Sequence, residues 1–395
     1  MKKASTHRPA SRGIRLSWHD PALRAIAYQV LVVGAVALVA WYLVANTLHN
    51  LAARNIATGF AFLDREAGFA IGESVIDYSP QDTYGRAILV GLANTLRVAS
   101  IGLILATLLG TVIGIARLST NWLLARCANA YVEFVRNIPL LLQLLIWYAL
   151  ISEVLPGPRN ALHPLPGVFL SNRGLMIPAL EGDSLTGILM AALAAIVVVA
   201  GIARRQRRIF RLTGEPRRLG VLSVAVLALL PTAGWLLTGR DIHISAPSAT
   251  AFGFDGGLTL SPELFALLAG LVSYTAAFIA EIVRSGIQSV GRGQWEAAQS
   301  MGLSKARVLR LVVLPQALRV IVPPLTSQYL NVVKNSSLAV AIGYPDLVSV
   351  VNTTLNQTGQ AIEGFLIVMA AYMTVSLAIS VFMNWYNARI VLVER

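Results

Sequence analysis

The chain has 395 residues, of which 56% are hydrophobic and only 13% are charged. Soluble domains carry about 25% charged residues, so this composition excludes an ordinary soluble protein and indicates a membrane protein. A single cysteine, Cys127, excludes an intramolecular disulfide, and the five scattered histidines lack a metal-ligand spacing. We therefore expect neither a metal site nor a cofactor on this chain. The formal charge of +13 would suit either nucleic acid or a membrane surface.

Eight segments are long and apolar enough to cross a bilayer, whose ~30 Å hydrocarbon core needs about 20 residues per helix. In chain order they cover residues 26–46, 96–116, 130–152, 185–203, 219–238, 262–283, 320–344 and 364–387. Pro139 and Pro231 are expected to kink the third and fifth spans, and Pro323 and Pro324 to start the seventh. The sequence predicts an all-α integral membrane protein with about eight transmembrane helices.

Lysine and arginine gather on one side of this arrangement. Residues 1–25 hold six of them, residues 204–218 seven and residues 284–319 six, and a pair follows each of the second and eighth spans. The total is 23 on this side against six on the other. Cytoplasmic loops are enriched in these residues, so both termini are predicted to be cytoplasmic. Attraction to anionic lipid headgroups explains the basic runs. We therefore expect membrane lipid as a partner, and we do not expect nucleic acid.

A polar and basic segment, GQWEAAQSMGLSKARVLRLVVLPQALRVIVPP, separates the sixth and seventh spans. Residues 295–301 are predicted to form a short helix that ends at Gly302 in a left-handed conformation. Ser304 is expected to cap a second helix over residues 305–314, which Pro315 ends or kinks. The segment is therefore expected to form a helical hairpin on the cytoplasmic side.

The first helix of this hairpin is slim, because Ala297 and Ala298 have small side chains, and Glu296 lies near its start. A slim helix can enter a cleft on another protein. The spacing alone leaves a second interpretation open, in which the hairpin only links two spans.

The full pattern of the hairpin resembles the EAA loop of ATP-binding-cassette (ABC) importer permeases. The matching residues are Glu296, Ala297, Ala298, Gly302, Leu314 and Pro315. The segments YVEFVRNIPLLLQLLIWY, YTAAFIAEIVRSGIQSVGRGQWEAAQSMGLS, VVKNSSLAVAIG and GLANTLRVAS are similar to the polar amino-acid branch of these permeases, which includes the histidine and glutamine systems. The resemblance covers residues 90–390, and the enlarged chain is most similar to the general L-amino-acid permeases of Gram-negative bacteria.

This resemblance implies a type I ABC importer transmembrane domain over residues 88–388. Within it, residues 153–245 would be an insertion carrying the fourth and fifth spans, and residues 293–319 the loop that couples to the ATPase. Ahead of it lie a cytoplasmic tail (1–25), an extra transmembrane helix (26–46) and a periplasmic loop (47–87) with a short interfacial helix. The first span has too long an apolar core for a signal peptide.

The resemblance also implies the partners and the location. The chain would reside in the bacterial inner membrane with a dimer of ABC ATPase subunits, a second related permease and a periplasmic amino-acid-binding protein. No Walker-type phosphate-binding motif occurs in the sequence, so ATP and Mg²⁺ are expected on the separate ATPase, and this chain is not expected to be an enzyme.

Lys334 lies inside the seventh span, beside Asn331, Asn335 and Ser336. A charge at mid-bilayer costs ~2.5–3.5 kcal/mol on insertion scales, so this ammonium must face protein or water. Two interpretations stay open: a structural lysine that is paired or reaches the interface, and a pathway residue that meets the carboxylate of an amino acid.

Two E-x-V-R sequences, Glu133 to Arg136 and Glu281 to Arg284, lie near the predicted cytoplasmic edge. Each can form a local ion pair at i,i+3, which contributes only a few tenths of a kcal/mol when exposed. The alternative is a charge network between helices that is rearranged as a gate closes.

An ion-gradient-driven secondary amino-acid transporter is the main alternative function, because a multi-span protein with an intramembrane lysine would permit it. The absence of acidic residues in mid-span and of paired inverted repeats argues against it. A membrane-bound enzyme would need a nucleophile and base or a histidine cluster, and an ion channel a selectivity filter; the sequence has no sign of either.

Overall fold

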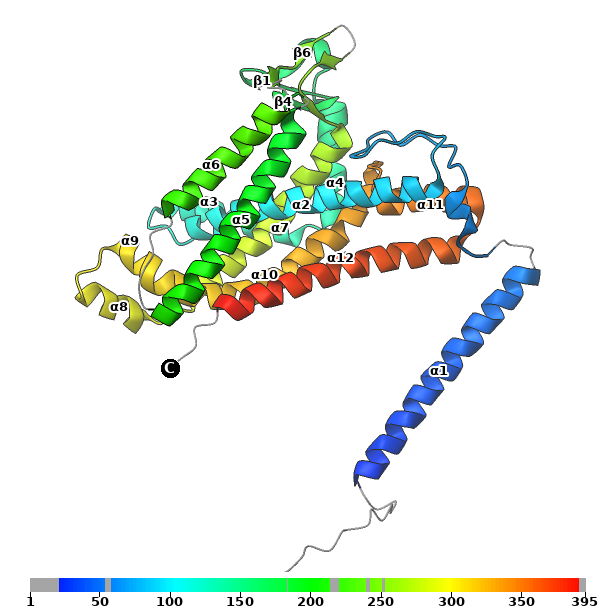
Figure 1. Ribbon diagram of the computed structural model, residues 1–395, viewed down its shortest axis with the longest axis horizontal. Helices are drawn as coiled ribbons and strands as arrows, with labels where there is room; N and C mark the ends of the chain where they lie inside the picture. Colours follow the sequence, from blue (N-terminus) through cyan, green and yellow to red (C-terminus); the bar gives the residue numbers. More distant parts are fainter. Residues whose placement is uncertain are drawn as a thin grey trace, which may run out of the picture.

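The computed structural model describes residues 21–53, 58–182, 184–213, 220–238, 242–250 and 253–390. Most of the predicted cytoplasmic tail and the last residues of the basic loop after the fourth span, 214–218, therefore lie outside the described residues. Helices dominate this part of the chain, as predicted (Figure 1). Five of them are long and apolar enough to cross a membrane, or six if one bent helix pair counts as a single span. The number eight and the side of each terminus remain predictions.

The first helix, α1 (Pro21–Ala53), lies apart from the other helices (Figure 1). Its large apolar side chains are exposed all round, from 56% at Leu43 to 69% at Trp41. A helix that is apolar on every face is suited to lipid or to the interior of a larger assembly. The predicted extra span is therefore present as a helix.

The centre of the bundle is the contact between α2 (Tyr84–Ala116) and α7 (Pro262–Gln288). Small residues at every fourth position of α2 make this contact close: Gly102, Ala106, Gly110 and Gly114 are all buried. A Cβ added at Gly110 would lie 2.7 Å from the Cβ of Ile279 and 2.8 Å from the carbonyl oxygen of Ala276. Small residues that let backbones approach are the usual basis of helix association in membranes.

The predicted third span is broken, which corrects the expectation of one kinked helix. α3 (Trp122–Asn137) and α4 (Leu140–Ala149) meet at an angle of 104° around Pro139. Proline has no N–H and disfavours a helical residue before it, and Ile138 is accordingly extended, with ψ of 129°. The amide of Gln143 donates to the carbonyl oxygens of Val135 and Ile138 at 2.8 and 2.9 Å, which satisfies backbone groups freed by the break. α4 continues through a π-turn, η2 (Leu150–Val154).

The seventh span differs from its prediction at three prolines. α9 (Lys305–Val308) passes through a π-turn, η4 (Leu309–Val313), directly into α10 (Leu314–Asn335). Pro315 therefore does not end the helix, because it occupies the first turn of α10, where a missing N–H costs little. Pro323 and Pro324 lie inside α10 and do not start it. A 3₁₀ segment, η5 (Ser336–Ile342), follows, then α11 (Leu347–Thr358) and α12 (Ala361–Ile390).

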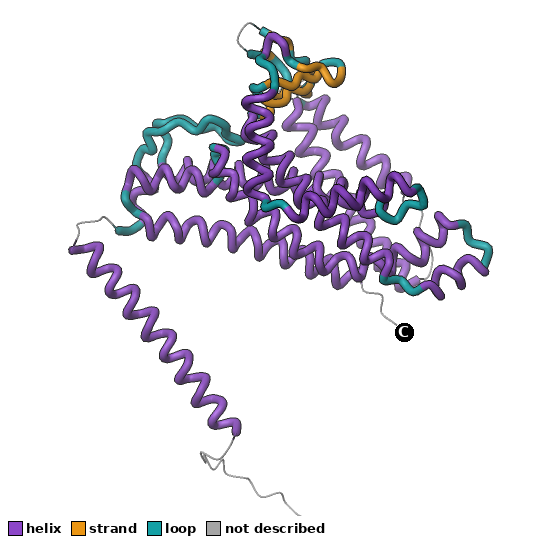
Figure 2. Tube along the Cα trace, turned by 180° about the vertical axis from the view of Figure 1, so that it is seen from behind, coloured by secondary structure: helices purple, strands orange, loops and turns teal. Residues whose placement is uncertain are grey.

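The predicted insertion contains α5 (Ser184–Thr213) and α6 (Gly220–Leu237), which pack mainly on each other, with Pro231 inside α6. Short strands, which were not predicted, gather beyond one end of these helices (Figure 2). Their order is β1-β2-β3-β8 in an antiparallel sheet, β4-β5 and β6-β7. The strands are Leu162–Leu165, Val168–Ser171, Gly174–Ile177, Ala179–Glu181, His243–Ser245, Ser248–Ala249, Phe254–Asp255 and Leu258–Leu260. The proposed boundaries of the insertion remain a prediction.

The segment before α2 is folded onto the bundle. A 3₁₀ turn, η1 (Phe60–Asp64), places the fully buried Phe62 against α2 and α11, in a cluster that includes Leu347 and Val351. A short helix was predicted in this loop, although at an interface. Within this turn Phe62 is buried because its side chain is apolar, whereas Phe60 and Ala61 are exposed.

Candidate coupling hairpin, pathway face and charge cluster

A helical hairpin connects α7 to α10 and projects from one end of the bundle (Figure 1), which we call the hairpin end. It consists of α8 (Arg292–Ser300) and the short α9. Gly302 joins them in the predicted left-handed conformation, with φ of +78°, and its N–H donates to the carbonyl oxygen of Gln299 at 2.8 Å. Ser304 occupies the capping position of α9, but its side chain makes no capping hydrogen bond.

The two alanines of the E-A-A sequence face in different directions. Ala298 is 5% exposed and belongs to a buried cluster that includes Val290, Val308 and Val313 and continues into α7 and α10. Glu296 and Ala297 are exposed, and Met301 is 81% exposed. Only part of the predicted E-A-A surface is therefore available to another protein. Met301 was not predicted, since its exposure depends on the turn at Gly302.

One face of α10 is polar and exposed. It carries Ser327, Asn331 and Lys334, which recur over two helical turns and are all exposed. Of the four predicted pathway residues, the structure thus places Asn331 and Lys334 together. Ser336 is buried, and its hydroxyl donates to the carbonyl oxygen of Val333 at 2.7 Å, while Asn335 is half-buried. Ser327 was missed, although a search at helical spacing from Lys334 would have found it.

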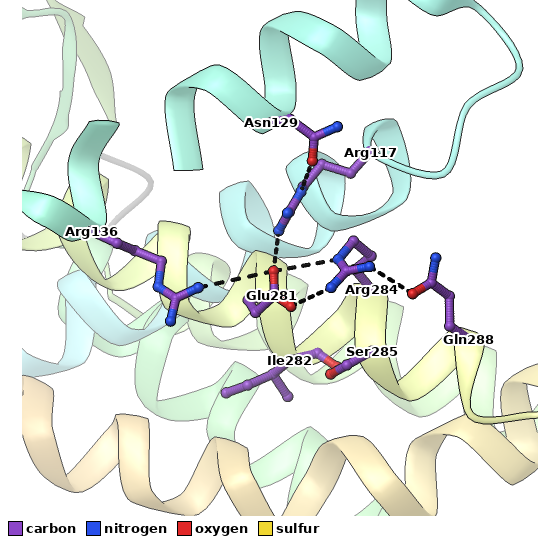
Figure 3. A network of polar contacts seen from close by, with 8 residues as sticks. All are labelled: Arg117, Asn129, Arg136, Glu281, Ile282, Arg284, Ser285 and Gln288. Atoms are coloured by element: carbon purple, nitrogen blue, oxygen red, sulfur yellow. Dashed lines mark hydrogen bonds and ion pairs between the residues drawn. The ribbon is translucent and has the colours of Figure 1, made fainter. Parts of the chain in front are cut away.

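Three arginines from different helices surround Glu281 near the hairpin end (Figure 3). Its carboxylate lies 2.5 Å from the guanidinium of Arg284 on the same helix and 2.5 Å from that of Arg117 at the end of α2. The guanidinium of Arg136 on α3 lies 4.0 Å away and also 5.0 Å from the ring centroid of Phe278. The Glu281 cluster therefore links α2, α3 and α7.

The cluster differs from the sequence prediction in two members. Arg117 was not predicted, yet it is the most buried of the three, with 8% of its side chain exposed, and its Nε donates to Asn129 at 2.6 Å. Glu133 was predicted, but it is exposed and makes no ion pair with any residue that the structure describes. Arg136 is directed toward α7 instead of pairing with Glu133 on its own helix.

A second polar cluster clamps the segment before α2 at the opposite end of the bundle. Glu73 accepts from Arg97 of α2 at 2.6 Å and from the hydroxyl of Ser261 at 2.7 Å. Ser261 in turn accepts from the N–H of Leu264 and so caps α7. The amide of Asn94 donates to the carbonyl oxygens of Glu73 and Pro345, both at 2.8 Å. The clamp was missed because its members are distant in sequence.

Asp346 lies beside this clamp, between η5 and α11. It is 1% exposed, and one of its oxygens accepts from the N–H of Ser349 at 2.8 Å, which caps α11. Burial raises the pKa of Asp346 to about 7, although backbone hydrogen bonds from α11 oppose the shift. Within the described residues, no group of three or more His, Cys, Asp or Glu side chains is placed to hold a metal ion.

Comparison with known proteins agrees with this architecture. Residues 219–392 match the family described as the binding-protein-dependent transport system inner membrane component. The chain is 49% identical over 392 residues to YhdX of Escherichia coli, described as an amino-acid ABC transporter permease, which covers 99% of this chain and 100% of that protein. It is 46% identical to AapQ of Rhizobium johnstonii, a general L-amino acid transport system permease, over 96% of each chain.

A third relative is BztB of Rhodobacter capsulatus, a glutamate/glutamine/aspartate/asparagine transport system permease. It is 40% identical over 98% of this chain and 99% of its own length. The protein is thus a multi-pass transmembrane subunit and not an enzyme. The chain belongs to the inner-membrane permease family of binding-protein-dependent ABC transporters.

Proposed function

We propose that this chain is a permease subunit of an ATP-driven importer that moves L-amino acids across the bacterial inner membrane. The substrate class is carried over from three relatives that match nearly the whole chain. A polar or broad range is favoured, because one relative is named for general L-amino acids and another for acidic amino acids and their amides. The observation that supports the mechanism is the projecting hairpin between α7 and α10.

The hairpin is the proposed contact with the ATPase. Glu296, Ala297 and Met301 face outward and would enter a cleft on that subunit. ATP and Mg²⁺ would bind elsewhere on the same ATPase. Ala298 and Gly302 hold the shape of the hairpin. Leu314 and Pro315 begin α10 directly after the π-turn, so a displacement of the hairpin would pass into the helix that carries the polar face. ATP binding would then bias the bundle between two conformations.

The polar face of α10 is the proposed pathway. Ser327, Asn331 and Lys334 would be costly against hydrocarbon, so we place a water-filled path between this face and the second, related permease. The Lys334 ammonium would meet the carboxylate that every amino acid carries. Asn335 and Ser336 would shape the turn into η5, since Ser336 is bonded to the backbone.

The Glu281 cluster is the proposed gate at the hairpin end. Exchanging the pair, with Glu281→Arg and Arg284→Glu, keeps a local ion pair but places a positive charge, in place of the carboxylate, beside Arg117 and Arg136. A gate formed by the cluster predicts loss of transport with the subunits still assembled. Normal transport by the exchanged variant would show that Glu281 and Arg284 form only a local ion pair, and would reject the role of the cluster as a gate.

The test of the function is uptake by the reconstituted system. The chain would be placed in proteoliposomes with its ATPase, the second permease and the periplasmic amino-acid-binding protein that this proposal implies. We expect L-amino-acid uptake that requires enclosed ATP and continues after ionophores collapse the ion gradients. Uptake that follows the gradients and ignores ATP would reject the proposal. A cysteine in place of Ala297 should also crosslink to the ATPase, whereas one at the buried Ala298 should not.

A further inference from the structure

An apolar groove runs along the inside of the bundle toward the hairpin end, on the side of α10 away from its polar face. It has a volume of about 470 Å³, and residues of α2, α7, α10 and α12 line it. On α2 its lining recurs at every fourth residue, from Leu103 through Thr107 and Thr111 to Ile115. The hydroxyl oxygens of Thr107 and Tyr329 lie 3.2 Å apart, so these two polar groups of the lining are paired with each other.

The dimensions of the groove fit a single hydrocarbon chain. Twelve residues separate Leu103 from Ile115, which is ~18 Å of helix at ~1.5 Å per residue. This length is somewhat more than half of the ~30 Å hydrocarbon core, and so about one leaflet. A volume of about 470 Å³ over that length gives a mean cross-section of ~26 Å². A whole helix is ~10 Å across and could not enter a groove of this width.

The groove opens to the membrane between α2 and α12. Both helices pack on α10, but they make no extended contact with each other. Ile115 on one rim is 51% exposed, and Phe382 and Tyr386 on the other are 58% and 41% exposed. A hydrocarbon chain of the surrounding lipid can therefore enter from the side.

A basic and aromatic group lies at the hairpin end of the groove. The guanidinium of Arg389 is 4.0 Å from the ring centroid of Trp385, one position from the groove residue Tyr386. Arg389 makes no ion pair with any residue that the structure describes. Tryptophan, tyrosine and arginine gather at the level of lipid headgroups, and a basic residue there attracts an anionic one.

We propose that this groove binds one acyl chain of an anionic phospholipid from the leaflet on the hairpin side, with its phosphate near Arg389. The chain lies between Val283 and Ile287 of α7 and Leu314 and Leu318 of α10. These two helices hold the hairpin, so the lipid supports the base of the proposed ATPase contact. The site itself does not depend on which substrate the protein carries.

Photolabelling tests the proposal. The full-length chain is placed in phosphatidylcholine vesicles that contain a phosphatidylglycerol with a diazirine midway along one acyl chain, and labelled peptides are mapped by mass spectrometry. We expect label on the groove residues of α2 and α10. Thr111→Phe should fill the groove and reduce the label on α10 about fivefold or more. Leu108→Phe is the control, because Leu108 is 61% exposed outside the groove and its substitution should leave the label unchanged.

Headgroup selectivity is measured separately, by competition with unlabelled lipids. Arg389→Gln should reduce the preference for phosphatidylglycerol over phosphatidylcholine about fivefold, which corresponds to ~1 kcal/mol for one basic residue. Two results would overturn the proposal, because each would show that the label comes from ordinary surrounding lipid. One is label spread evenly over the outer face of α2, and the other is label on α10 that Thr111→Phe does not change. If Thr111→Phe does not fold, the label map of the unaltered chain and the Arg389→Gln result still decide. Failure here would leave ATP-driven uptake untouched.

Discussion

Replacing Glu281 by glutamine removes the one negative charge among three arginines while keeping the shape of the side chain. Two charge-assisted hydrogen bonds of 2.5 Å are weakened, to Arg117 and to Arg284. Such a bond contributes ~1.5–3 kcal/mol, and a buried charge that loses its partner adds a desolvation penalty. Glu281 is 28% exposed, which reduces both effects, but Arg117 is only 8% exposed. We expect a total loss of ~3 kcal/mol of folding free energy.

The chain offers a matched control in Glu133→Gln, the same chemical change at an exposed carboxylate that forms no ion pair with the part of the chain that the structure describes. Its effect should stay within ~0.5 kcal/mol. The measurement is the Tm of the purified chain in one detergent, where ~2 °C per kcal/mol predicts a fall of ~6 °C for Glu281→Gln. A double-mutant cycle should give a coupling of ~1 kcal/mol or more between Glu281 and Arg117, and little between Glu281 and Arg136, which are 4.0 Å apart. Equal Tm values for the two glutamine variants would refute this reasoning.

Three further predictions concern the helix contact, the buried carboxylate and the hairpin. Gly110→Ala should destabilise the bundle by ~1–3 kcal/mol through overpacking against α7. Gly201→Ala is the control and should not destabilise it, because no atom lies within 4 Å of the added Cβ. Equal Tm values for the two variants would contradict the close contact between α2 and α7. The pKa of Asp346 is raised to about 7, so the folded state takes up a proton more readily than the unfolded state, and stability should rise as the pH falls from about 7 toward the ordinary value of 3.8. Asp346→Asn should therefore raise the Tm more at pH 8 than at pH 5, and a pH-independent change would reject the assignment. Met301→Asp should weaken binding to the ATPase by about tenfold without lowering the Tm, since Met301 is 81% exposed; a loss of Tm would show that its role is in folding.

Sequence patterns predict well those structural features that depend on residues close together along the chain. The turn at Gly302 is local, and it adopts the predicted left-handed conformation. The long apolar helices also follow from composition. The helix was expected to end or kink at Pro315, and it does not end there, because a π-turn that the sequence does not reveal joins it to the preceding helix.

Features that join distant residues could not be found in this way. Arg117 meets Glu281 across 164 residues, and Glu73 meets Ser261 across 188. A spacing rule predicted a local partner for Arg136, but the break at Pro139 and the packing of α3 on α7 direct it elsewhere. The strands between residues 162 and 260 have two to four residues each, too few for an alternating pattern to be recognised.

The close approach of α2 and α7 has a mechanical consequence. At Ala106, Gly110 and Gly114, α2 contributes no side chain larger than alanine, and Ile279 and Val283 of α7 pack directly against its backbone, so the two helices have little freedom to slide and should move as one rigid unit. That unit begins at the Ser261 cap, where Glu73 is anchored, and ends beside the Glu281 cluster. If the proposed ATPase contact tilts these helices at the hairpin end, their opposite end at the Ser261 cap would therefore shift at the same moment. No relay of side chains between the two ends would be needed.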